Sequence, residues 1–233
     1  MRRKEKTTYI RSSRQLITQT EPKSPISEQY RAIRTSIEYS SVDKEIKSMV
    51  ITSANPSEGK STTIANLAIV FAQQGKKVLI IDTDLRKPTV HYTFKLSNLN
   101  GIVQVLTKQI RFEDAVQETE IDNLFVLTSG SIPPNPAELL SSVTMQKFVE
   151  HIREDFDMIF FDAPPVLAVA DAQILANLCD ASSLVIASGQ TEIDAAMKAK
   201  EMLQQSSSKF LGVILNGKEM KSGEYYYYYG TKK

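Results

Sequence analysis

At residues 53–62 the chain reads Ser53-Ala54-Asn55-Pro56-Ser57-Glu58-Gly59-Lys60-Ser61-Thr62, and the segments on either side of this stretch decide the fold. Residues 48–52 form a short apolar run that predicts a buried strand. Residues 64–72 carry apolar side chains at helical spacing, which predicts a helix. A strand, a tight polar loop and a helix in this order are the setting of a phosphate-binding loop.

The loop itself contains the groups that such a site requires. Gly59 lets the backbone approach phosphate oxygens, and the first turn of the following helix offers N–H groups without intrahelical partners. Lys60 can reach the β- and γ-phosphates, and the Ser61 hydroxyl can bind magnesium. The usual pattern begins with glycine where this chain has Ala54, but the cradle consists mainly of backbone donors. We therefore assign the whole loop to the nucleotide: Ala54, Asn55, Pro56, Ser57, Glu58, Gly59, Lys60, Ser61 and Thr62.

Length and composition describe an ordinary globular protein. The 233 residues suffice for one α/β core, with 42% hydrophobic and 24% charged residues. A net charge of +1 gives no reason to expect nucleic acid as a partner. The single cysteine, Cys179, fits a reducing compartment and is expected to be a packed thiol. No apolar run approaches the length of a membrane span, so we expect a cytosolic protein or one attached peripherally.

Strands and helices alternate after the loop. Further strands are predicted at residues 78–81, 124–127, 158–161, 183–187 and 211–215, and helices at residues 137–154 and 192–205. This alternation predicts an α/β fold of the P-loop NTPase type, with a doubly wound, mostly parallel sheet and helices on both faces. The chain then divides into a flexible basic arm at 1–22, a P-loop domain at 23–219 and a flexible tail at 220–233. The arm is either a solvated tail or a segment attracted to anionic lipid heads.

Three aspartates lie at the ends of predicted strands, at the edge where open α/β sheets bind ligands. Asp82 and Asp84 stand two residues apart and should project together. One of them can complete a magnesium shell and the other can accept a proton from an attacking hydroxyl; the alternative is polar residues that close a strand. Asp162 closes a Walker B pattern, whose carboxylate holds magnesium through water. Arg86 is expected to steady the transferring phosphate or to contact a neighbouring subunit.

The sequence also suggests the two substrates of a phosphoryl transfer. ATP is the expected nucleotide because no Asn-Lys-x-Asp guanine signature is present, and Asn216 is a candidate contact to the base. Near the end of the chain stand five consecutive phenols, Tyr225, Tyr226, Tyr227, Tyr228 and Tyr229. They are either a low-complexity tail or the phosphate acceptors. Each phosphotyrosine would add about −1.5 to −2 charges, so phosphorylation would release the tail from a carboxylate-lined site.

A helix is predicted to begin at Ser24-Pro25, as an N-cap followed by proline at the first helical position. On its polar faces stand Glu28, Arg31 and Arg34. Glu28 and Arg31 can pair within the helix at i, i+3, where solvated charges contribute little. The alternative is that these residues meet a neighbouring subunit, and composition leaves both interpretations open.

These motifs together resemble the bacterial tyrosine kinases of capsular and exopolysaccharide biosynthesis. The resemblance extends from about Pro25 to the end of the chain. It rests on a Walker A motif at 54–62, a Walker A′ motif at 79–88, a Walker B motif at 159–165 and the similar segment 130–140. The tyrosine run is denser than the interspersed clusters common in the family, which leaves open how many of the tyrosines are used.

The resemblance implies roles for particular residues. Asp82 would be the catalytic base, helped by Lys60 and Arg86, and magnesium would be held by Ser61, Asp84 and Asp162. ATP would be the phosphate donor, and subunits would phosphorylate one another on the tail tyrosines 225–229. The motif Glu28, Arg31 and Arg34 would support a ring-like homo-oligomer.

The resemblance also implies partners. A chain of this kind is similar to the cytoplasmic kinase of a two-component form, in which a membrane-embedded activator supplies a cytoplasmic segment. Such a kinase would lie at the inner face of the membrane through its activator. A cognate phosphotyrosine phosphatase and other protein tyrosine substrates complete the expected partners.

The competing interpretation is an ATPase of the partitioning and septum-site type, a nucleotide-dependent binding switch. That class places a second lysine near the start of its loop. Here the loop opens with Thr52, Ser53, Ala54 and Asn55, which counts against this class.

Overall fold

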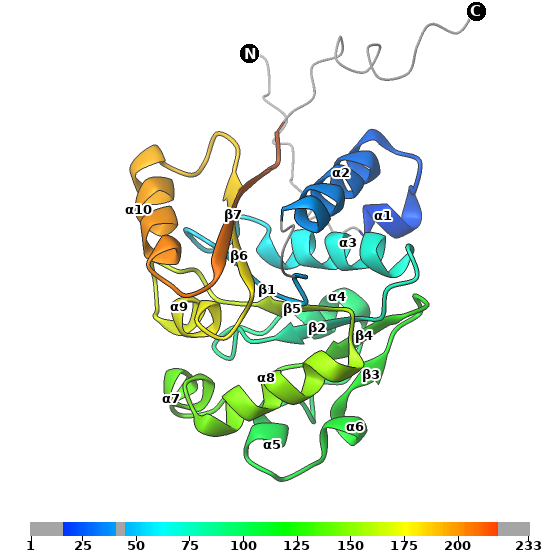
Figure 1. The fold of residues 1–233 in the computed structure, drawn as a ribbon, viewed down its shortest axis with the longest axis vertical. Helices are drawn as coiled ribbons and strands as arrows, with labels where there is room; N and C mark the ends of the chain where they lie inside the picture. Colours follow the sequence, from blue (N-terminus) through cyan, green and yellow to red (C-terminus); the bar gives the residue numbers. More distant parts are fainter. Residues whose placement is uncertain (1–15, 41–44, 219–233) are drawn as a thin grey trace, which may run out of the picture.

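The computed structural model describes residues 16–40 and 45–218. The tyrosine tail and most of the basic arm lie outside the described residues. Within the described part, a seven-stranded sheet runs in the order β3-β4-β2-β5-β1-β6-β7 (Figure 1). Neighbouring strands pair parallel, except that β3 and β4 pair antiparallel. The strands are β1 Ser48–Ser53, β2 Val78–Asp82, β3 Gln117–Glu118, β4 Leu124–Leu127, β5 Met158–Asp162, β6 Ala181–Ala187 and β7 Lys209–Asn216.

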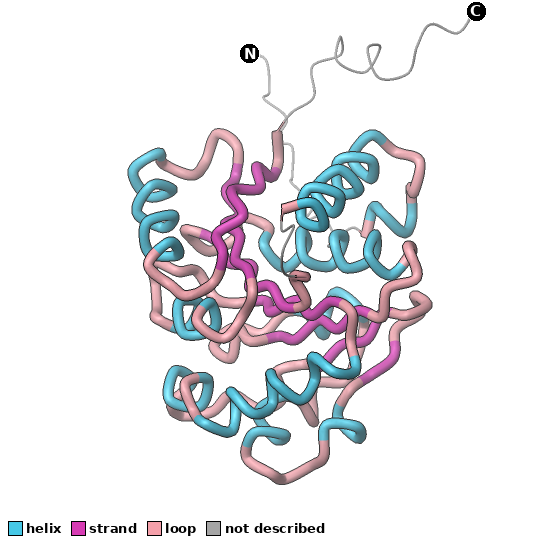
Figure 2. Tube along the Cα trace, in the orientation of Figure 1, coloured by secondary structure: helices cyan, strands magenta, loops and turns pink. Residues whose placement is uncertain are grey.

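Helices cover both faces of the sheet (Figure 1; Figure 2). One face carries α1 Ile17–Thr20, α2 Pro25–Tyr39, α3 Lys60–Ala72 and α4 Val90–Phe94. The other face carries α5 Ile102–Leu106, α6 Phe112–Ala115, α7 Pro136–Leu140, α8 Val143–Asp155, α9 Asp171–Ala176 and α10 Ile193–Gln204. The predicted doubly wound α/β fold is therefore confirmed. No helix in the described ranges is long and apolar enough to cross a bilayer.

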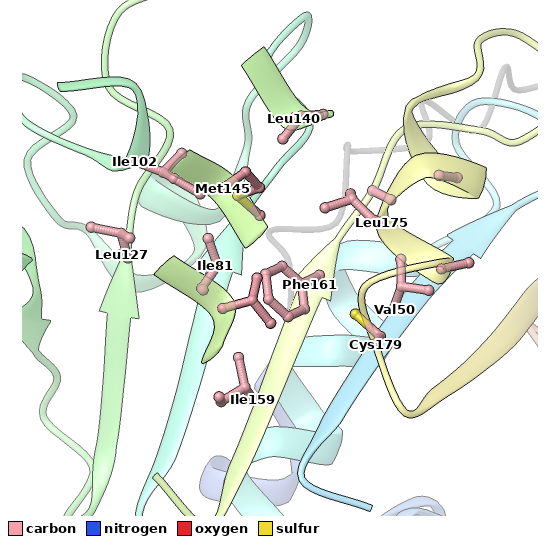
Figure 3. Packing of buried hydrophobic residues seen from close by; sticks show 14 of the residues in the cluster. Val50, Ile81, Ile102, Leu127, Leu140, Met145, Ile159, Phe161, Leu175 and Cys179 are labelled. Atoms are coloured by element: carbon pink, nitrogen blue, oxygen red, sulfur yellow. The ribbon is translucent and has the colours of Figure 1, made fainter. Parts of the chain in front are cut away.

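Two apolar clusters, one on each face, explain why the strands are apolar without interruption. In β1, Val50 belongs to one cluster, whereas Met49 and Ile51 belong to the other, because successive side chains point to opposite faces. Figure 3 shows Val50, Leu175 and Cys179 in the first cluster. Cys179 is the packed thiol that the sequence predicted, and burial raises the pKa of its thiol group.

The helix predicted at residues 137–154 is wrong as one continuous element. The structure has two helices there, α7 and α8, which are separated at Ser141 and Ser142. Ser142 has an extended backbone, and its side-chain oxygen accepts a hydrogen bond from the N–H of Met145 at 3.1 Å. This N-cap starts a new helix, because it satisfies a backbone donor that would otherwise lack a partner.

The folded part begins earlier than predicted, so the limit of the flexible arm at residue 22 is placed too late. Helix α1 packs on α3, and the side chain of Thr18 is fully buried there. The N–H and hydroxyl of Thr18 both donate to Oδ1 of Asn66, at 3.0 and 2.9 Å. Asn66 in turn donates from Nδ2 to the carbonyl of Thr62, at 2.9 Å. One asparagine therefore ties the N-terminal segment to the first turns of α3.

We expect Asn66→Ala to lower the free energy of unfolding by about 1–3 kcal/mol, because the buried N–H of Thr18 loses its acceptor and the Thr18 hydroxyl keeps only the longer bond to the carbonyl of residue 66. Gln74→Ala, an exposed position just after the same helix, is the matched control and should change stability by less than about 0.5 kcal/mol. Urea unfolding followed by circular dichroism measures both. Equal stabilities of the two variants would contradict the role given to Asn66.

Candidate functional site

The phosphate loop connects the end of β1 to the start of α3, as the sequence predicted. Gly59 is the N-cap of α3 and has a φ of 91°, a left-handed conformation that favours glycine. Helix α3 begins directly afterwards at Lys60, so its first N–H groups face the loop. The combination of a left-handed glycine and an open helix N-terminus is the geometry that binds phosphate oxygens.

Two residues far away in the chain, Thr191 after β6 and Asn216 in β7, hold the loop in place through Glu58, and sequence reasoning missed this role for both. Glu58 is buried, and its carboxylate accepts hydrogen bonds from the N–H of Asn55 at 3.0 Å and from the hydroxyl of Thr191 at 2.6 Å. Asn216, the last residue of β7, donates from Nδ2 to the carbonyl of Glu58 at 2.9 Å. The loop is therefore braced from the segment that follows β6 and from the last residue of β7. The contact of Asn216 with the base stays a prediction.

Gly59 also lies against Asn216, which gives a sharp test of the loop. A Cβ atom at Gly59 would lie 2.0 Å from Nδ2 of Asn216, whereas Gly75 has a similar φ of 89° and no atom within 4 Å of such a Cβ. Gly59→Ala should therefore weaken ATP binding about a hundredfold or more, because both the backbone conformation and the brace are disturbed. Gly75→Ala carries the same kind of backbone strain and should bind ATP normally; isothermal titration calorimetry compares the two.

Lys60 lies between two carboxylates at the floor of the site. Its Nζ is 3.0 Å from Oδ1 of Asp162 and 3.1 Å from Oδ2 of Asp84. The Lys60 side chain is only 11% exposed, so burial acts to lower its pKa. The two carboxylates outweigh burial and raise the pKa of Lys60 above its ordinary value. The lysine therefore stays charged, as a group that binds phosphate must.

The donor set around Ser61 and Asp162 fits a magnesium ion. Oδ2 of Asp162 is buried and has no hydrogen-bond partner in the described structure, which suits a carboxylate that acts through water on a metal. Ser61 lies in the first turn of α3, and its hydroxyl accepts a hydrogen bond from the Thr89 hydroxyl at 3.2 Å. Among the described residues no group of three or more His, Cys, Asp or Glu could hold a metal.

Asp82 and Asp84 have different hydrogen-bond partners, and the N–H of Asp84 itself donates to Oδ1 of Asp82 at 3.3 Å. Strand β2 ends at Asp82, so the alternation of a strand no longer applies two residues later. The carboxylate of Asp82 is fully buried and accepts from the N–H groups of Thr89 and Val90, both at 2.9 Å. Burial, together with the nearby charge of Asp162, raises the pKa of Asp82 to about 7. Asp84 is thus ion-paired with Lys60, whereas Asp82 is bound by backbone N–H groups at the start of α4.

A pocket of about 620 Å³ opens over the loop. It is lined by eight of the residues assigned from the sequence: Pro56, Ser57, Gly59, Lys60, Ser61, Thr62, Asp84 and Arg86. Six others are not part of the lining: Ala54, Asn55, Glu58, Asp82, Asp162 and Asn216. Sequence reasoning missed six lining residues: Lys87, Thr89, Pro164, Pro165, Ala168 and Val169. Proximity to the Walker A′ aspartates could have indicated Lys87 and Thr89, and proximity to Asp162 could have indicated Pro164 and Pro165; no such signal points to Ala168 or Val169.

Arg86, which lines this pocket, is bound to a residue that the sequence did not single out. Its Nε and Nη2 donate to the two carboxylate oxygens of Asp171, at 3.0 and 3.2 Å. Asp171 is fully buried at the first turn of α9, whereas the Arg86 side chain is 40% exposed. This bidentate pair raises the pKa of Arg86, although the guanidinium would be charged in any case.

The three residues assigned to a subunit interface occupy different environments on α2. Glu28 and Arg31 form the predicted i, i+3 pair, at 2.5 Å. Arg34 turns inward, and its Nη1 donates to the carbonyl of Val70 in α3 at 2.8 Å. An interface role for the three stays a prediction. The phosphate-acceptor tyrosines 225–229 lie outside the described residues.

The fold and the site together define a nucleotide-binding domain of the P-loop NTPase class. Residues 46–209 match the AAA domain family. The tyrosine-protein kinase YwqD of Bacillus subtilis is 60% identical over 222 residues, covering 95% of this chain and 94% of that protein. The chain therefore belongs to the bacterial tyrosine-protein kinases, which are ATP-dependent protein-tyrosine kinases.

Solved structures agree with this family. The chimerical protein CapA2B2 has a TM-score of 0.83 and 42% identity, covering 86% of this chain and 88% of that chain. The kinase domain of the Escherichia coli tyrosine kinase ETK also has a TM-score of 0.83, with 32% identity over 87% of this chain and 80% of that chain. The septum-site protein MinD from Pyrococcus horikoshii, at 24% identity and a TM-score of 0.63, shows only a shared fold. The septum-site ATPases, the competing interpretation of the sequence, are thus only distant structural relatives of this chain.

Proposed function

We propose that this chain transfers the γ-phosphoryl group of ATP to tyrosines 225–229 of a neighbouring copy, and thereby regulates capsular or exopolysaccharide synthesis. The observation that carries the proposal is Lys60, held charged between Asp84 and Asp162 above a braced phosphate loop. Five consecutive phenols in the same chain supply acceptors for a phosphotransferase of this family.

Each side chain has a definite part in the transfer. Lys60 and the N–H groups at the start of α3 bind the phosphates, and Arg86 adds a cation to the lining of the pocket. Ser61, Asp84 and Asp162 would hold Mg²⁺, which supplies charge neutralisation at the β- and γ-phosphates when it is bound. Asp82 takes the phenolic proton. Its hydrogen bonds from the N–H groups of Thr89 and Val90 must rearrange before the phenol can reach the carboxylate.

The partners follow from the same assignment. A membrane-embedded activator supplies a cytoplasmic segment, and the kinase lies at the inner face of the membrane through it. Copies of the chain assemble into a ring through Glu28, Arg31 and Arg34, where Glu28 remains 58% exposed for such a contact. A cognate phosphatase reverses the modification, and other tyrosine proteins are further substrates.

The test uses labelled ATP, magnesium and the full chain, with and without an activating membrane segment. Mass spectrometry maps the phosphate on wild-type protein and on a variant in which tyrosines 225–229 are all phenylalanine. We expect label on the tail of the wild type only. Mixing this phenylalanine variant with a chain that carries Lys60→Met should label the Lys60→Met chain, because its tail is intact and the phosphate comes from another copy.

Absence of label from the tail, with the activating segment present and ATP binding intact, would overturn the proposal. Label on the wild-type tail, together with an unlabelled Lys60→Met chain in the mixture, would overturn transfer between copies and leave the kinase activity itself in place. Asp82→Asn tests the base separately, because undiminished transfer by that variant would remove only the role of Asp82.

A further inference from the structure

Thr89 stands at the start of α4, but its side chain does not cap that helix. It is the N-cap residue of α4, where a threonine ordinarily accepts a hydrogen bond from a backbone N–H of the first turn, and it forms no such side-chain cap. The N–H groups of Thr89 and Val90 donate instead to the carboxylate of Asp82, both at 2.9 Å. The start of α4 is therefore satisfied from the end of β2, and the Thr89 hydroxyl is left for another contact.

The hydroxyl of Thr89 reaches the phosphate-binding helix. It donates to Oγ of Ser61 at 3.2 Å, across 28 residues of sequence. Helix α4 packs against α3, which carries Ser61 in its first turn, and both residues line the pocket over the phosphate loop. The contact thus joins the segment that follows the Walker A′ aspartates to the oxygen that the Walker A motif assigns to magnesium.

The backbone of Thr89 is held on both sides of its Cα atom. Its own N–H is bound to Asp82, whose carboxylate is fully buried. The next residue, Val90, donates to the same carboxylate, and its side chain is buried in the apolar cluster on the α3 face of the sheet. The hydroxyl of Thr89 is therefore presented to Ser61 from a fixed position.

A serine oxygen at a metal site benefits from such a donor. A hydroxyl has one proton and two lone pairs, and it rotates about its C–O bond unless a partner fixes it. In the described structure Nζ of Lys60 lies 3.5 Å from Oγ of Ser61, as a second donor beside Thr89. With Lys60 on the phosphates, one lone pair of Ser61 is left for a cation while Thr89 keeps the other. Mg²⁺ demands near-ideal octahedral geometry, so the direction of that lone pair matters.

We propose that Thr89 is a positioning residue of the magnesium site, where its hydroxyl orients Oγ of Ser61 toward the ion. This rests on the proposed kinase function, which assigns Ser61 to Mg²⁺. The hydrogen bond from the N–H of Thr89 to Asp82 fixes the place from which the hydroxyl acts. Partners that orient a metal ligand in this way typically contribute about 10–100-fold to metal affinity.

A binding experiment tests this role without catalysis. Thr89→Val keeps the branched side chain and the N–H to Asp82 and removes only the hydroxyl, whereas Thr89→Ser keeps the hydroxyl. Mg²⁺ is titrated into the full chain with bound ADP and followed by calorimetry, and ADP affinity is measured separately with a chelator present. We expect Thr89→Val to weaken Mg²⁺ binding about tenfold and to change metal-free ADP affinity less than about twofold. Thr89→Ser should bind Mg²⁺ nearly like the wild type.

The same helix offers a matched control. The hydroxyl of Thr93 donates to the carbonyl of Thr89 at 3.4 Å rather than to Ser61, and Thr93 does not line the pocket. Thr93→Val should therefore leave Mg²⁺ affinity unchanged, which separates the orientation of Ser61 from a general loosening of α4. Thermal melting identifies any variant that fails to fold, and Thr89→Ser keeps the comparison available if Thr89→Val does.

A double variant tests the route through Ser61. Ser61→Ala removes the ligand itself, so adding Thr89→Val to it should weaken Mg²⁺ binding no further, because both changes act on one contact. In the transfer assay, Thr89→Val should be slow at low Mg²⁺ and recover when the Mg²⁺ concentration is raised about tenfold. A loss caused by structural damage would not respond to the metal.

Four results would overturn the role of Thr89. They are an unchanged Mg²⁺ affinity in Thr89→Val, an equal loss in Thr93→Val or Thr89→Ser, a further loss in the Ser61→Ala background, and no Mg²⁺ binding to the ADP-bound wild type. Mg²⁺ binding that depends on Thr89, in a protein that transfers no phosphate to its tail with the activating segment present, would sustain the positioning role while the kinase function fails.

Discussion

Lys60→Met is expected to reduce phosphate transfer about 10²–10³-fold or more, because it removes the buried cation that is placed to reach the β- and γ-phosphates. The same change should destabilise the nucleotide-free protein. The Asp84 and Asp162 side chains are 8% and 0% exposed, and both have Lys60 as their ion-pair partner. Leaving such carboxylates without a counter-charge costs about 3–5 kcal/mol.

A double variant separates the two effects of Lys60. Lys60→Met with Asp162→Asn removes one of the stranded charges, so it should recover part of the lost stability and none of the activity. Urea unfolding and the transfer assay measure the two quantities on the same samples. A Lys60→Met protein as stable as the wild type would show that the carboxylates find another counter-charge. A double variant that regains activity would contradict the assignment of Lys60 to the phosphates.

Asp162→Asn should lower transfer about a hundredfold or more and abolish the dependence on magnesium. The carboxylate offers a buried oxygen without a partner, Oδ2, and an amide in its place no longer attracts a hydrated cation. In wild-type protein, adding Mg²⁺ to a sample with ADP should raise the melting temperature beyond the effect of ADP alone, since a ligand that binds only the folded state stabilises it. In Asp162→Asn this increment should vanish.

The opposite end of the same strand supplies the control. Asp157 precedes β5 and accepts from the N–H of Lys77 at 2.8 Å, at an exposed position. Asp157→Asn should preserve both the magnesium increment and the transfer rate. If Asp162→Asn kept the magnesium increment, the free oxygen of Asp162 would not be part of the metal shell. Removal of magnesium from the wild type with a chelator should reproduce the rate of Asp162→Asn.

Local patterns predicted much of this fold from the sequence. Strands β2, β4 and β5 were located to within a residue, because each is a short apolar run that both faces of the sheet bury. The Ser24 cap and Pro25 placed the start of α2 correctly. The apolar periodicity predicted one helix where the structure has two, α7 and α8, because the Ser142 side chain binds the backbone and starts a new helix.

Site residues that belong to contiguous sequence motifs could be predicted, whereas those that depend on tertiary contacts could not. Lys60 and its two carboxylates follow from the motifs. Asp171, in contrast, lies 85 residues from Arg86, and no spacing rule relates the two. The inward turn of Arg34 toward Val70 likewise depends on how α2 packs on α3, which the charge pattern of a single helix does not contain. The end of β2 at Asp82 decided which aspartate reaches the pocket.

The brace on the phosphate loop has a consequence for how the protein is made. Glu58 and Asn216 are 158 residues apart in the chain, and Glu58 and Thr191 are 133 apart. At about 5–20 residues per second, roughly 7–30 s of translation separate the synthesis of the loop from that of the residues that hold it. A nascent chain therefore carries its nucleotide motif long before that motif has its final shape. We expect a ribosome-bound chain that stops before residue 191 to bind ATP weakly, so competence for ATP arrives only after β7 has been synthesised.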